Sequence, residues 1–332
     1  MNYKYTIAFD VNGNDKGVIE CFNGAKRFAM ENPNVLVKLV GSVASLQGLN
    51  EFENIELINN ENKPSDPKNI RKSMSEDTSM NQAINLVLDS QADAVLSSGD
   101  SGTYISTLTL KAKRLPNVSR PAFMPIATAS NNRKFLILDV GANLETKTEY
   151  YLEWAALASA FYSAMFKKDL PQVSLINIGT EEYKGNENVQ QANALLKEDK
   201  RFEYLGFMEP KTLFKGNTDI VLTDGYAGNI MIKSFEGAIS SFKDILKDQI
   251  KVSIWRKLGA LLLKPAFKGV ADKLDYRSIA SAWVIGVNAV ALKAHGSSDA
   301  LAYYNALKNI KLALESNVLA QMKEVMQQNE DN

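Results

Sequence analysis

The chain has 332 residues, 45% of them hydrophobic, and its 38 basic residues balance its 38 acidic residues. A net charge of zero provides no global field to attract nucleic acid, so no nucleic-acid partner is expected. The single cysteine, Cys21, cannot form an internal disulfide, and no apolar run approaches the roughly 20 residues that span a bilayer. These features predict a cytoplasmic protein of enzyme size that would meet a membrane only from its surface.

Short apolar runs alternate with helical sequence along the chain. The predicted strands cover residues 5–10, 35–40, 55–58, 94–96, 121–127, 135–140, 173–178, 202–207, 219–222 and 287–292. The predicted helices include residues 77–88, 149–166 and 186–196, a long helical region from residue 229 and a last helix from about residue 299. This alternation is typical of an α/β protein, so we expect one catalytic domain over residues 1–332. Its three-layer parallel or mixed sheet would carry helices on both faces, and strands 121–127 and 135–140 are candidates for a hairpin.

Five of the predicted strands end abruptly in loops of Gly, Ser, Asn and Asp. These loops are residues 98–102, 141–143, 179–181, 224–229 and 295–299. In sheets of parallel strands, ligands bind outside the carboxyl ends of the strands, where such loops gather. Small residues let backbone N–H groups approach a ligand closely, and the N-termini of the following helices favour an anion. The loops therefore predict a binding site for a phosphate-like group.

Side chains able to act on such an anion follow several of these strands. His295, the only histidine, could donate to a phosphate or an oxyanion or shuttle a proton, although a lone histidine is also common as a hydrogen-bonded structural residue. Lys184 could hold an anion as a point charge, or it could lie in a solvated turn whose Asn186 caps the next helix. Asn229 and Asn143 could supply amide donors or serve as helix caps.

Several familiar site types are missing from the sequence. It contains no Walker phosphate-binding motif and no Cys-x-x-Cys pair, and it has too few histidines and cysteines for a zinc site, so no metal is expected. The single histidine limits any Ser-His-Asp arrangement to one centred on His295. Covalent catalysis has little support. Direct transfer between two bound substrates needs positioning and oxyanion stabilisation, which Gly-rich loops can provide.

The segment of residues 239–273 departs from the alternating pattern. Apolar residues recur every four positions from Phe242 to Leu258, and eight basic and three acidic residues give the segment a net charge of +5. Pro265 and the glycines around it predict a protruding, amphipathic helical hairpin rather than one rod. Such a hairpin can lie on an anionic membrane or contact an acidic protein, but an ordinary dimer or core helix with a solvated face would show the same pattern. The residues expected to contact a membrane or a carrier protein are Lys251, Trp255, Arg256, Lys257, Leu258, Leu261 and Leu262.

Four motifs occur in an order that resembles one bacterial family. They are FLILDVGAN at residues 135–143, IGTEEYKGNE at 178–187, TDGYAGN at 223–229 and KAHGSSD at 293–299. Together with DAVLSSGDSG at 93–102, they resemble the phosphate acyltransferases of bacterial phospholipid synthesis, the PlsX family, over nearly the whole chain. Each motif alone is weakly specific, and their common order is the specific signal.

The resemblance implies transfer of a fatty acyl group from acyl carrier protein to inorganic phosphate, which gives acyl phosphate for glycerophospholipid synthesis. It also implies a fold similar to isocitrate and isopropylmalate dehydrogenases, a homodimer, peripheral association with an anionic membrane, and no dissociable cofactor. Together with the strand-end loops, the resemblance leads us to expect His295, Lys184 and Asn229 in catalysis. Phosphate would bind at Ser98, Gly99, Asp100, Ser101, Gly102, Asn143, Gly225, Gly296 and Ser297.

The chain departs from the family's pattern at two loops and at a Gly-Gly pair expected before the last strand, where residues 279–282 read IASA. The family usually has Asp-Ala-Met-Gly-Gly-Asp where residues 10–15 read DVNGND, and Gly-Asn-Thr-Gly where residues 99–102 read GDSG. The second change places the potential carboxylate of Asp100 beside the expected anion site. Two other classes of function stay open. One is a non-enzymatic module that binds acyl chains or a membrane surface, and the other is a metal- and NAD-dependent decarboxylating dehydrogenase of the same fold.

Overall fold

The computed structural model describes residues 3–66, 68–273 and 281–327, and in these residues eleven strands form one sheet. The strands are β1 (Tyr5–Asp10), β2 (Val35–Gly41), β3 (Ile55–Asn59), β4 (Ala94–Ser97), β5 (Ala122–Thr128), β6 (Lys134–Leu138), β7 (Gln172–Ile176), β8 (Glu203–Met208), β9 (Ile220–Leu222), β10 (Ser281–Ile285) and β11 (Val290–Ala294). The α-helices are α1 (Val18–Glu31), α2 (Ile70–Ser75), α3 (Ser79–Leu88), α4 (Ser101–Lys111), α5 (Thr148–Phe166), α6 (Glu187–Glu198), α7 (Gly225–Lys251), α8 (Ile254–Leu262), α9 (Lys264–Lys273), α10 (Ala300–Glu315) and α11 (Val318–Gln327). Short 3-10 helices cover Ala44–Leu49 and Pro210–Lys215.

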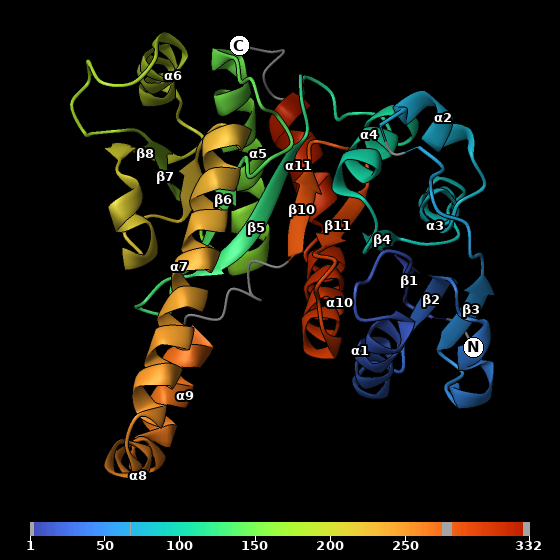
Figure 1. Cartoon of the computed structure of the whole chain (residues 1–332). Coiled ribbons are helices and arrows are strands. Elements are labelled where there is room, and N and C mark those ends of the chain that lie inside the picture. The colour runs from blue at the N-terminus through green and yellow to red at the C-terminus, as the bar shows by residue number, and fades with distance from the viewer. Residues whose placement is uncertain (1–2, 67, 274–280, 328–332) are drawn as a thin grey trace.

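The sheet is mixed, and its strand directions change at its centre (Figure 1). The strand order is β3-β2-β1-β4-β11-β10-β5-β6-β9-β7-β8. Strands β3, β2, β1, β4 and β11 are parallel to one another, as are β6, β9, β7 and β8. Between these halves, β10 pairs antiparallel with β11 and β5, and β5 pairs antiparallel with β6. Strand β5 joins the halves, because residues 122–125 pair with β10 and residues 126–128 pair with β6.

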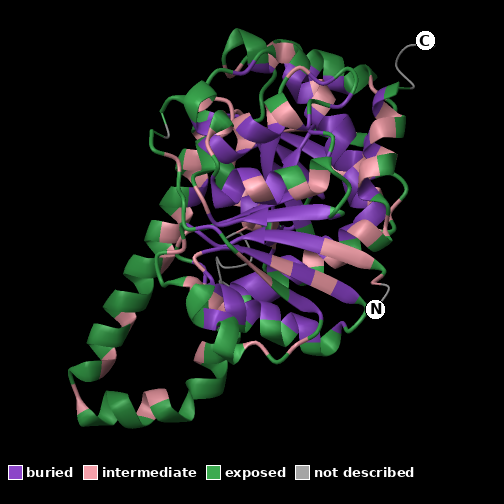
Figure 2. Cartoon of the chain, turned by 90° about the vertical axis from the view of Figure 1, so that its right-hand side faces the viewer, coloured by how far each residue is buried: buried purple, intermediate pink, exposed green. Residues whose placement is uncertain are grey.

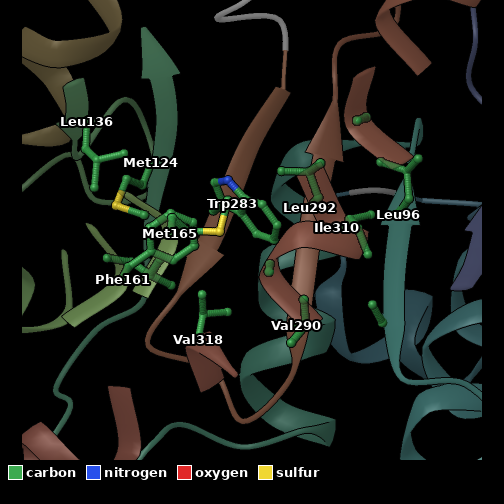
Figure 3. Close-up of a cluster of buried hydrophobic side chains, with 14 of the residues drawn as sticks. Leu96, Met124, Leu136, Phe161, Met165, Trp283, Val290, Leu292, Ile310 and Val318 are labelled. Atoms are coloured by element: carbon green, nitrogen blue, oxygen red, sulfur yellow. The ribbon is translucent and has the colours of Figure 1, made fainter. Parts of the chain in front are cut away.

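One face of the sheet carries the largest hydrophobic core. Helices α1, α5, α6, α10 and α11 cover this face, and their apolar side chains meet alternate residues of the strands. Figure 3 shows part of this core, where Trp283 of β10 lies near Met124 of β5, Leu292 of β11, Phe161 of α5 and Ile310 of α10. Burial of each such side chain stabilises the fold by roughly 1.5–3 kcal/mol. This continuous core holds the two halves of the sheet together.

The opposite face is covered in two separate parts. Helices α3 and α4 pack on the N-terminal half through a cluster that includes Ile84 and Tyr104. Helix α7 packs on the other half, where Ile232 meets Phe135 and Val221 in a second cluster. Between the two clusters, residues of β5, β10 and β11 border a cavity. The arrangement of helices on this face therefore creates the space in which a ligand can bind.

The expected mixed α/β sheet with helices on both faces is confirmed, and so is the hairpin, which consists of β5 and β6. The sequence-based prediction is wrong in two details at the last two strands, β10 and β11. Strand β10 has no counterpart in the sequence-based prediction, and the last strand is Val290–Ala294 rather than residues 287–292. Gly286 has a φ of +84°, so the chain turns there, and Val287 belongs to the turn between β10 and β11.

Residues 239–273, named the arm below, project from the body of the protein (Figure 2). The second half of α7 leads outward, α8 lies at the tip, and α9 returns toward the sheet. The chain bends at residues 252–253 and at Leu263 instead of at Pro265, because Pro265 is the second residue of α9, where a proline is tolerated. No side chain of α8 is buried. Among the described helices, none is long and apolar enough to cross a membrane.

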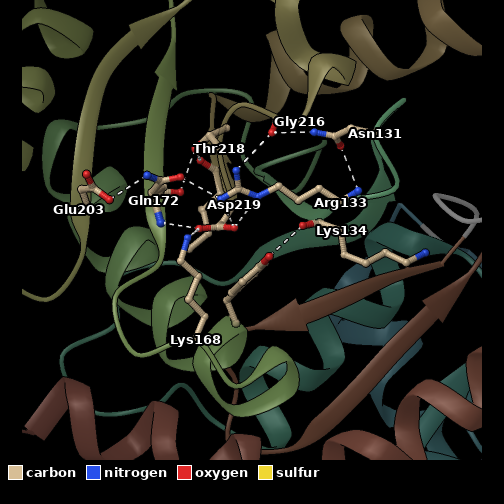
Figure 4. Close-up of polar contacts among 11 residues, drawn as sticks. Asn131, Arg133, Lys134, Lys168, Gln172, Glu203, Gly216, Thr218 and Asp219 are labelled. Carbon is tan, nitrogen blue, oxygen red and sulfur yellow. Dashed lines mark hydrogen bonds and ion pairs between the residues drawn. The ribbon is translucent and has the colours of Figure 1, made fainter.

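A buried carboxylate joins the starts of three neighbouring parallel strands, β6, β9 and β7 (Figure 4). Asp219, which precedes β9, accepts hydrogen bonds at its Oδ1 from the Arg133 guanidinium at 2.6 and 2.9 Å. Its Oδ2 accepts the Gln172 N–H at 2.7 Å and pairs with the ammonium of Lys168. Burial would raise the pKa of Asp219, but these donors together hold it below its ordinary value of 3.8.

The substitution Asp219→Asn is expected to lower the free energy of unfolding by about 3 kcal/mol at pH 7, because it removes the charge between two cations. The pKa of Asp219 is lower in the folded than in the unfolded chain, so its stabilisation is present above the unfolded value and is lost as the pH falls below 3.8. Urea unfolding of the wild type, Asp219→Asn and the exposed control Glu51→Gln at pH 7 and pH 3 measures this. Equal stability of the two variants at pH 7 would contradict the account.

Candidate active site

A cavity of about 310 Å³ opens between α4 and α7, where the covering clusters separate. The strands contribute Phe123 and Pro125 of β5, Ala282 of β10 and Lys293 of β11 to its lining. The other lining residues are Ser101, Val140, Gly141, Asn229, Ile232, Lys233, Glu236, Ala294 and His295. The loops after β4, β6 and β11 and the N-terminal turns of α7 therefore meet at one cavity, although they lie far apart in the sequence.

The loop after β6 is held in shape by the buried carboxylate of Asp139. Its Oδ1 accepts the backbone N–H groups of Phe123 at 3.0 Å, Gly141 at 3.2 Å and Ala142 at 3.0 Å. Its Oδ2 accepts the backbone N–H of Asn143 at 2.7 Å and the Asn143 side-chain amide at 3.0 Å. Burial raises the pKa of Asp139, and these hydrogen bonds oppose the shift. The Asn143 amide is therefore used to organise the loop.

The N-terminus of α7 packs directly on this loop because two glycines leave room for it. A Cβ at Gly225 would lie 2.3 Å from the Asn143 carbonyl oxygen, and a Cβ at Gly228 would lie 2.0 Å from the Asp139 carbonyl oxygen. The N-cap of the helix is Asp224, whose carboxylate accepts the Ala227 N–H at 2.7 Å. This close packing brings Asn229, in the second turn of α7, to the wall of the cavity.

His295 lies at the exposed rim of the cavity, directly after β11. Its Nδ1 accepts the Ser297 N–H at 3.2 Å and lies 2.8 Å from the Ser297 Oγ. Because Nδ1 acts as an acceptor, a neutral imidazole carries its proton on Nε2. The ring can therefore donate a hydrogen bond from Nε2 to an anion or an oxyanion in the cavity.

The loop after β4 begins α4 at the cavity. Asp100 is the N-cap of α4, and its Oδ1 accepts hydrogen bonds from the Thr103 N–H at 2.8 Å and the Thr103 hydroxyl at 2.9 Å. The unusual carboxylate of this loop is thus bound to its own helix. Ser101 follows Asp100 and lines the cavity, whereas Ser98 is buried and its hydroxyl donates to Tyr303 at 3.0 Å.

The structure brings together only part of the predicted site. Ser101, Asn229 and His295 line the cavity. The predicted phosphate ligands Ser98, Gly99, Asp100, Gly102, Asn143, Gly225, Gly296 and Ser297 belong to the same loops but are not among the lining residues. Lys184 is also outside the lining, and its Nζ forms an ion pair with Glu181 Oε1 at 2.8 Å.

The sequence analysis did not select three charged lining residues, Lys233, Glu236 and Lys293, and of these only Lys293 is buried. It lies inside β11, is 7% exposed, and its ammonium donates to the carbonyl oxygen of Ala294. Burial lowers the pKa of Lys293 to about 8, and the carboxylates of Asp10, Asp100 and Asp15 oppose this shift. A lysine within an otherwise apolar strand was the available signal, because lysine is rarely fully buried. No group of three or more His, Cys, Asp or Glu residues in the described ranges could hold a metal ion.

Comparison with known proteins shows the family to which the chain belongs. A family model described as "Fatty acid synthesis protein" matches residues 5–321. The chain is 51% identical to a phosphate acyltransferase of Mycoplasmopsis agalactiae, over 96% of this chain and 97% of the relative. It is 44% identical to a phosphate acyltransferase of Mycoplasma mobile, over 96% of this chain and 99% of the relative.

The fold is also similar to that of a branched-chain phosphotransacylase from Enterococcus faecalis V583. The TM-score is 0.61, with 11% sequence identity over 94% of this chain and 98% of that chain. The mixed sheet thus has the same fold as this phosphotransacylase. The chain belongs to the phosphate acyltransferase family, as its motifs indicated, and is an acyltransferase of fatty acid and phospholipid synthesis.

The substitution Gly228→Ala is expected to lower the free energy of unfolding by about 1–3 kcal/mol, because the new methyl group overlaps the Asp139 carbonyl. It should also reduce acyl transfer, since α7 must move away from the loop. Gly237→Ala is the matched control in the same helix, because a Cβ there meets nothing within 4 Å. The control should stabilise α7 by up to about 1 kcal/mol. Urea unfolding and initial rates measure both effects, and identical behaviour of the two variants would contradict the packing argument.

Proposed function

We propose that the chain transfers a fatty acyl group from the thioester of acyl carrier protein to inorganic phosphate, giving acyl phosphate for glycerophospholipid synthesis. The observation that carries the proposal is the meeting of three strand-end loops and the N-terminus of α7 at one cavity, in a chain of the phosphate acyltransferase family. The N-terminal turns of α4 and α7 both border this cavity, and helix N-termini favour anions.

The reaction needs no covalent enzyme intermediate. A phosphate oxygen attacks the carbonyl carbon of the thioester, a C–O bond forms, and the carbonyl oxygen becomes an oxyanion. Nε2–H of His295 donates to this oxyanion, and the Asn229 amide orients the phosphate. The intermediate then collapses, the C–S bond breaks, and the carrier thiolate leaves and takes a proton from solvent. Phosphate positioning and oxyanion stabilisation supply the catalysis.

The substitution His295→Ala is expected to lower turnover by about 100-fold or more, because removal of one oxyanion donor typically has this effect. The exposed ring should contribute little to the core, so the variant should unfold like the wild type. The control is Asn288→Ala, an exposed residue in the turn between β10 and β11. Acyl phosphate and free thiol are measured after mixing acyl carrier protein thioester with phosphate. If folded His295→Ala turns over as fast as the wild type, His295 takes no part in the reaction. If the wild type binds the thioester but forms no product, the chain is a non-enzymatic binding module.

We further propose that the arm binds an anionic membrane surface peripherally. Trp255 and Leu262 of α8 are 79% and 83% exposed, and Leu258 and Leu261 lie exposed on the same short helix. Lys251 is the last residue of α7, and Arg256 and Lys257 belong to α8 itself. Insertion of each large apolar side chain would contribute roughly 1.5–3 kcal/mol, and each basic residue about 1 kcal/mol near anionic lipid. Apolar insertion would therefore dominate, and charge would orient the arm.

The double substitution Trp255→Ala/Leu262→Ala is expected to weaken binding to phosphatidylglycerol vesicles at least about tenfold, since about 1.4 kcal/mol corresponds to that factor. The matched control is Met30→Ala/Leu110→Ala, which removes two exposed apolar side chains outside the arm. Co-sedimentation measures both variants. Unchanged vesicle binding, accompanied by a higher KM for the carrier thioester, would assign the arm to carrier-protein docking instead.

We also propose that the chain forms a homodimer, which light scattering of the wild type measures.

A further inference from the structure

Lys293 is the one buried basic side chain among residues 3–66, 68–270 and 281–327, the residues whose burial the structure describes. Its position follows from the two-residue period of β11. Leu292 and Ala294 point into the large core, and Ala291 packs in the cluster under α3 and α4 on the opposite face. Lys293 therefore points to the face on which the cavity opens, and it lines that cavity.

The register of the sheet places Lys293 in a row of aligned residues across five strands. Asp10 pairs with Ser97, Ser97 with Lys293, Lys293 with Ala282, and Ala282 with Pro125. Neighbouring strands are about 4.8 Å apart, so Asp10 is two strand spacings from Lys293. The two buried ionisable side chains are thus separated by Ser97, and no ion pair within 4.0 Å joins them.

The hydrogen bonds of this row give the Lys293 ammonium fewer acceptors than it has N–H donors. Asp10 accepts the Ser79 hydroxyl at 2.6 Å, the Ser97 hydroxyl at 2.7 Å and the Asn12 N–H at 3.3 Å. An ammonium has three N–H donors. In the described part of the chain, the only recorded acceptor of Lys293 is the Ala294 carbonyl. A buried cation is costly unless it is paired, so the remaining donors favour an anion in the cavity.

We propose that Lys293 is the residue that binds the charge of the acceptor anion, inorganic phosphate, from the strand side of the cavity. This inference rests on the proposed function. It assigns the role of cationic phosphate ligand to Lys293, because Lys184 pairs with Glu181 and lies outside the cavity lining. The ammonium contacts phosphate oxygens that do not attack, while His295 at the rim stays available for the thioester oxyanion. In this arrangement Lys293 holds the phosphate in place, and the other residues of the cavity position the thioester next to it.

Anion binding at this position depends on pH in a defined direction. The titratable groups around Lys293 are Asp10 from β1, Asp15 and Asp100 from the adjacent loops, His295 from its own loop, and Lys233 and Glu236 from α7. A bound anion stabilises the ammonium and raises its pKa from about 8. Binding above this value therefore takes up a proton, and affinity falls as the pH rises further.

The test compares the wild type with Lys293→Met, which keeps an unbranched side chain one atom shorter and without charge, and with Lys293→Arg. Lys63→Met, at an exposed position, is the matched control. Inorganic phosphate is titrated by calorimetry at pH 7 and pH 9, and at pH 9 in two buffers of different ionisation enthalpy.

Lys293→Met should bind phosphate at least about tenfold more weakly at pH 7. Its affinity should not fall above pH 8, and its binding at pH 9 should take up no proton. Lys293→Arg should retain part of the affinity.

Thermal unfolding with and without phosphate separates this role from a structural one. Without phosphate, Lys293→Met should be at least as stable as the wild type, because it removes an unpaired buried charge. Phosphate should then raise the melting temperature of the wild type and the Lys63→Met control, but not that of Lys293→Met.

If folded Lys293→Met binds phosphate with wild-type affinity, the inference is overturned while the proposed acyl transfer is not. Phosphate binding through Lys293 in a protein that forms no acyl phosphate would support the inference and overturn the proposed function.

Discussion

The Asp139 carboxylate is the interaction on which the candidate site depends. Four backbone N–H groups and one amide converge on it, so the loop after β6 has one defined shape. Helix α7 can begin against that loop because Gly225 and Gly228 have no side chains. The same helix then continues outward into the arm. One buried carboxylate therefore couples the wall of the cavity to the surface proposed to meet the membrane.

The change of strand direction at β5 and β10 explains why a cavity exists at all. Two parallel half-sheets, each with its own helices, share a single core on one face. On the other face the helices belong to separate clusters, and the middle strands remain accessible between α4 and α7. A charged residue in those strands can then reach a ligand while it is shielded from bulk water. Lys293 occupies such a position.

Local sequence predicted most of the fold, because alternating apolar runs and capped helices are short-range signals. It missed β10, a short strand whose partners, β11 and β5, are fixed only by long-range pairing. For the site, strand-end glycines indicated the loops that meet, including those of Asn229 and His295. The sequence could not show that Lys184 lies outside the cavity, that Asp100 caps α4, or that Lys293 faces a ligand space. These facts depend on strand register and on helices packed from distant segments.

The central claim is direct attack of bound phosphate on an acyl thioester, and isotope transfer tests it most directly. Phosphate labelled with ¹⁸O at every oxygen is mixed with the protein and the thioester of acyl carrier protein, and the acyl product is analysed by mass spectrometry. The account predicts acyl phosphate that retains all of the label, with one free thiol for each product formed. Thiol release that does not require phosphate, with unlabelled fatty acid as the product, would contradict it.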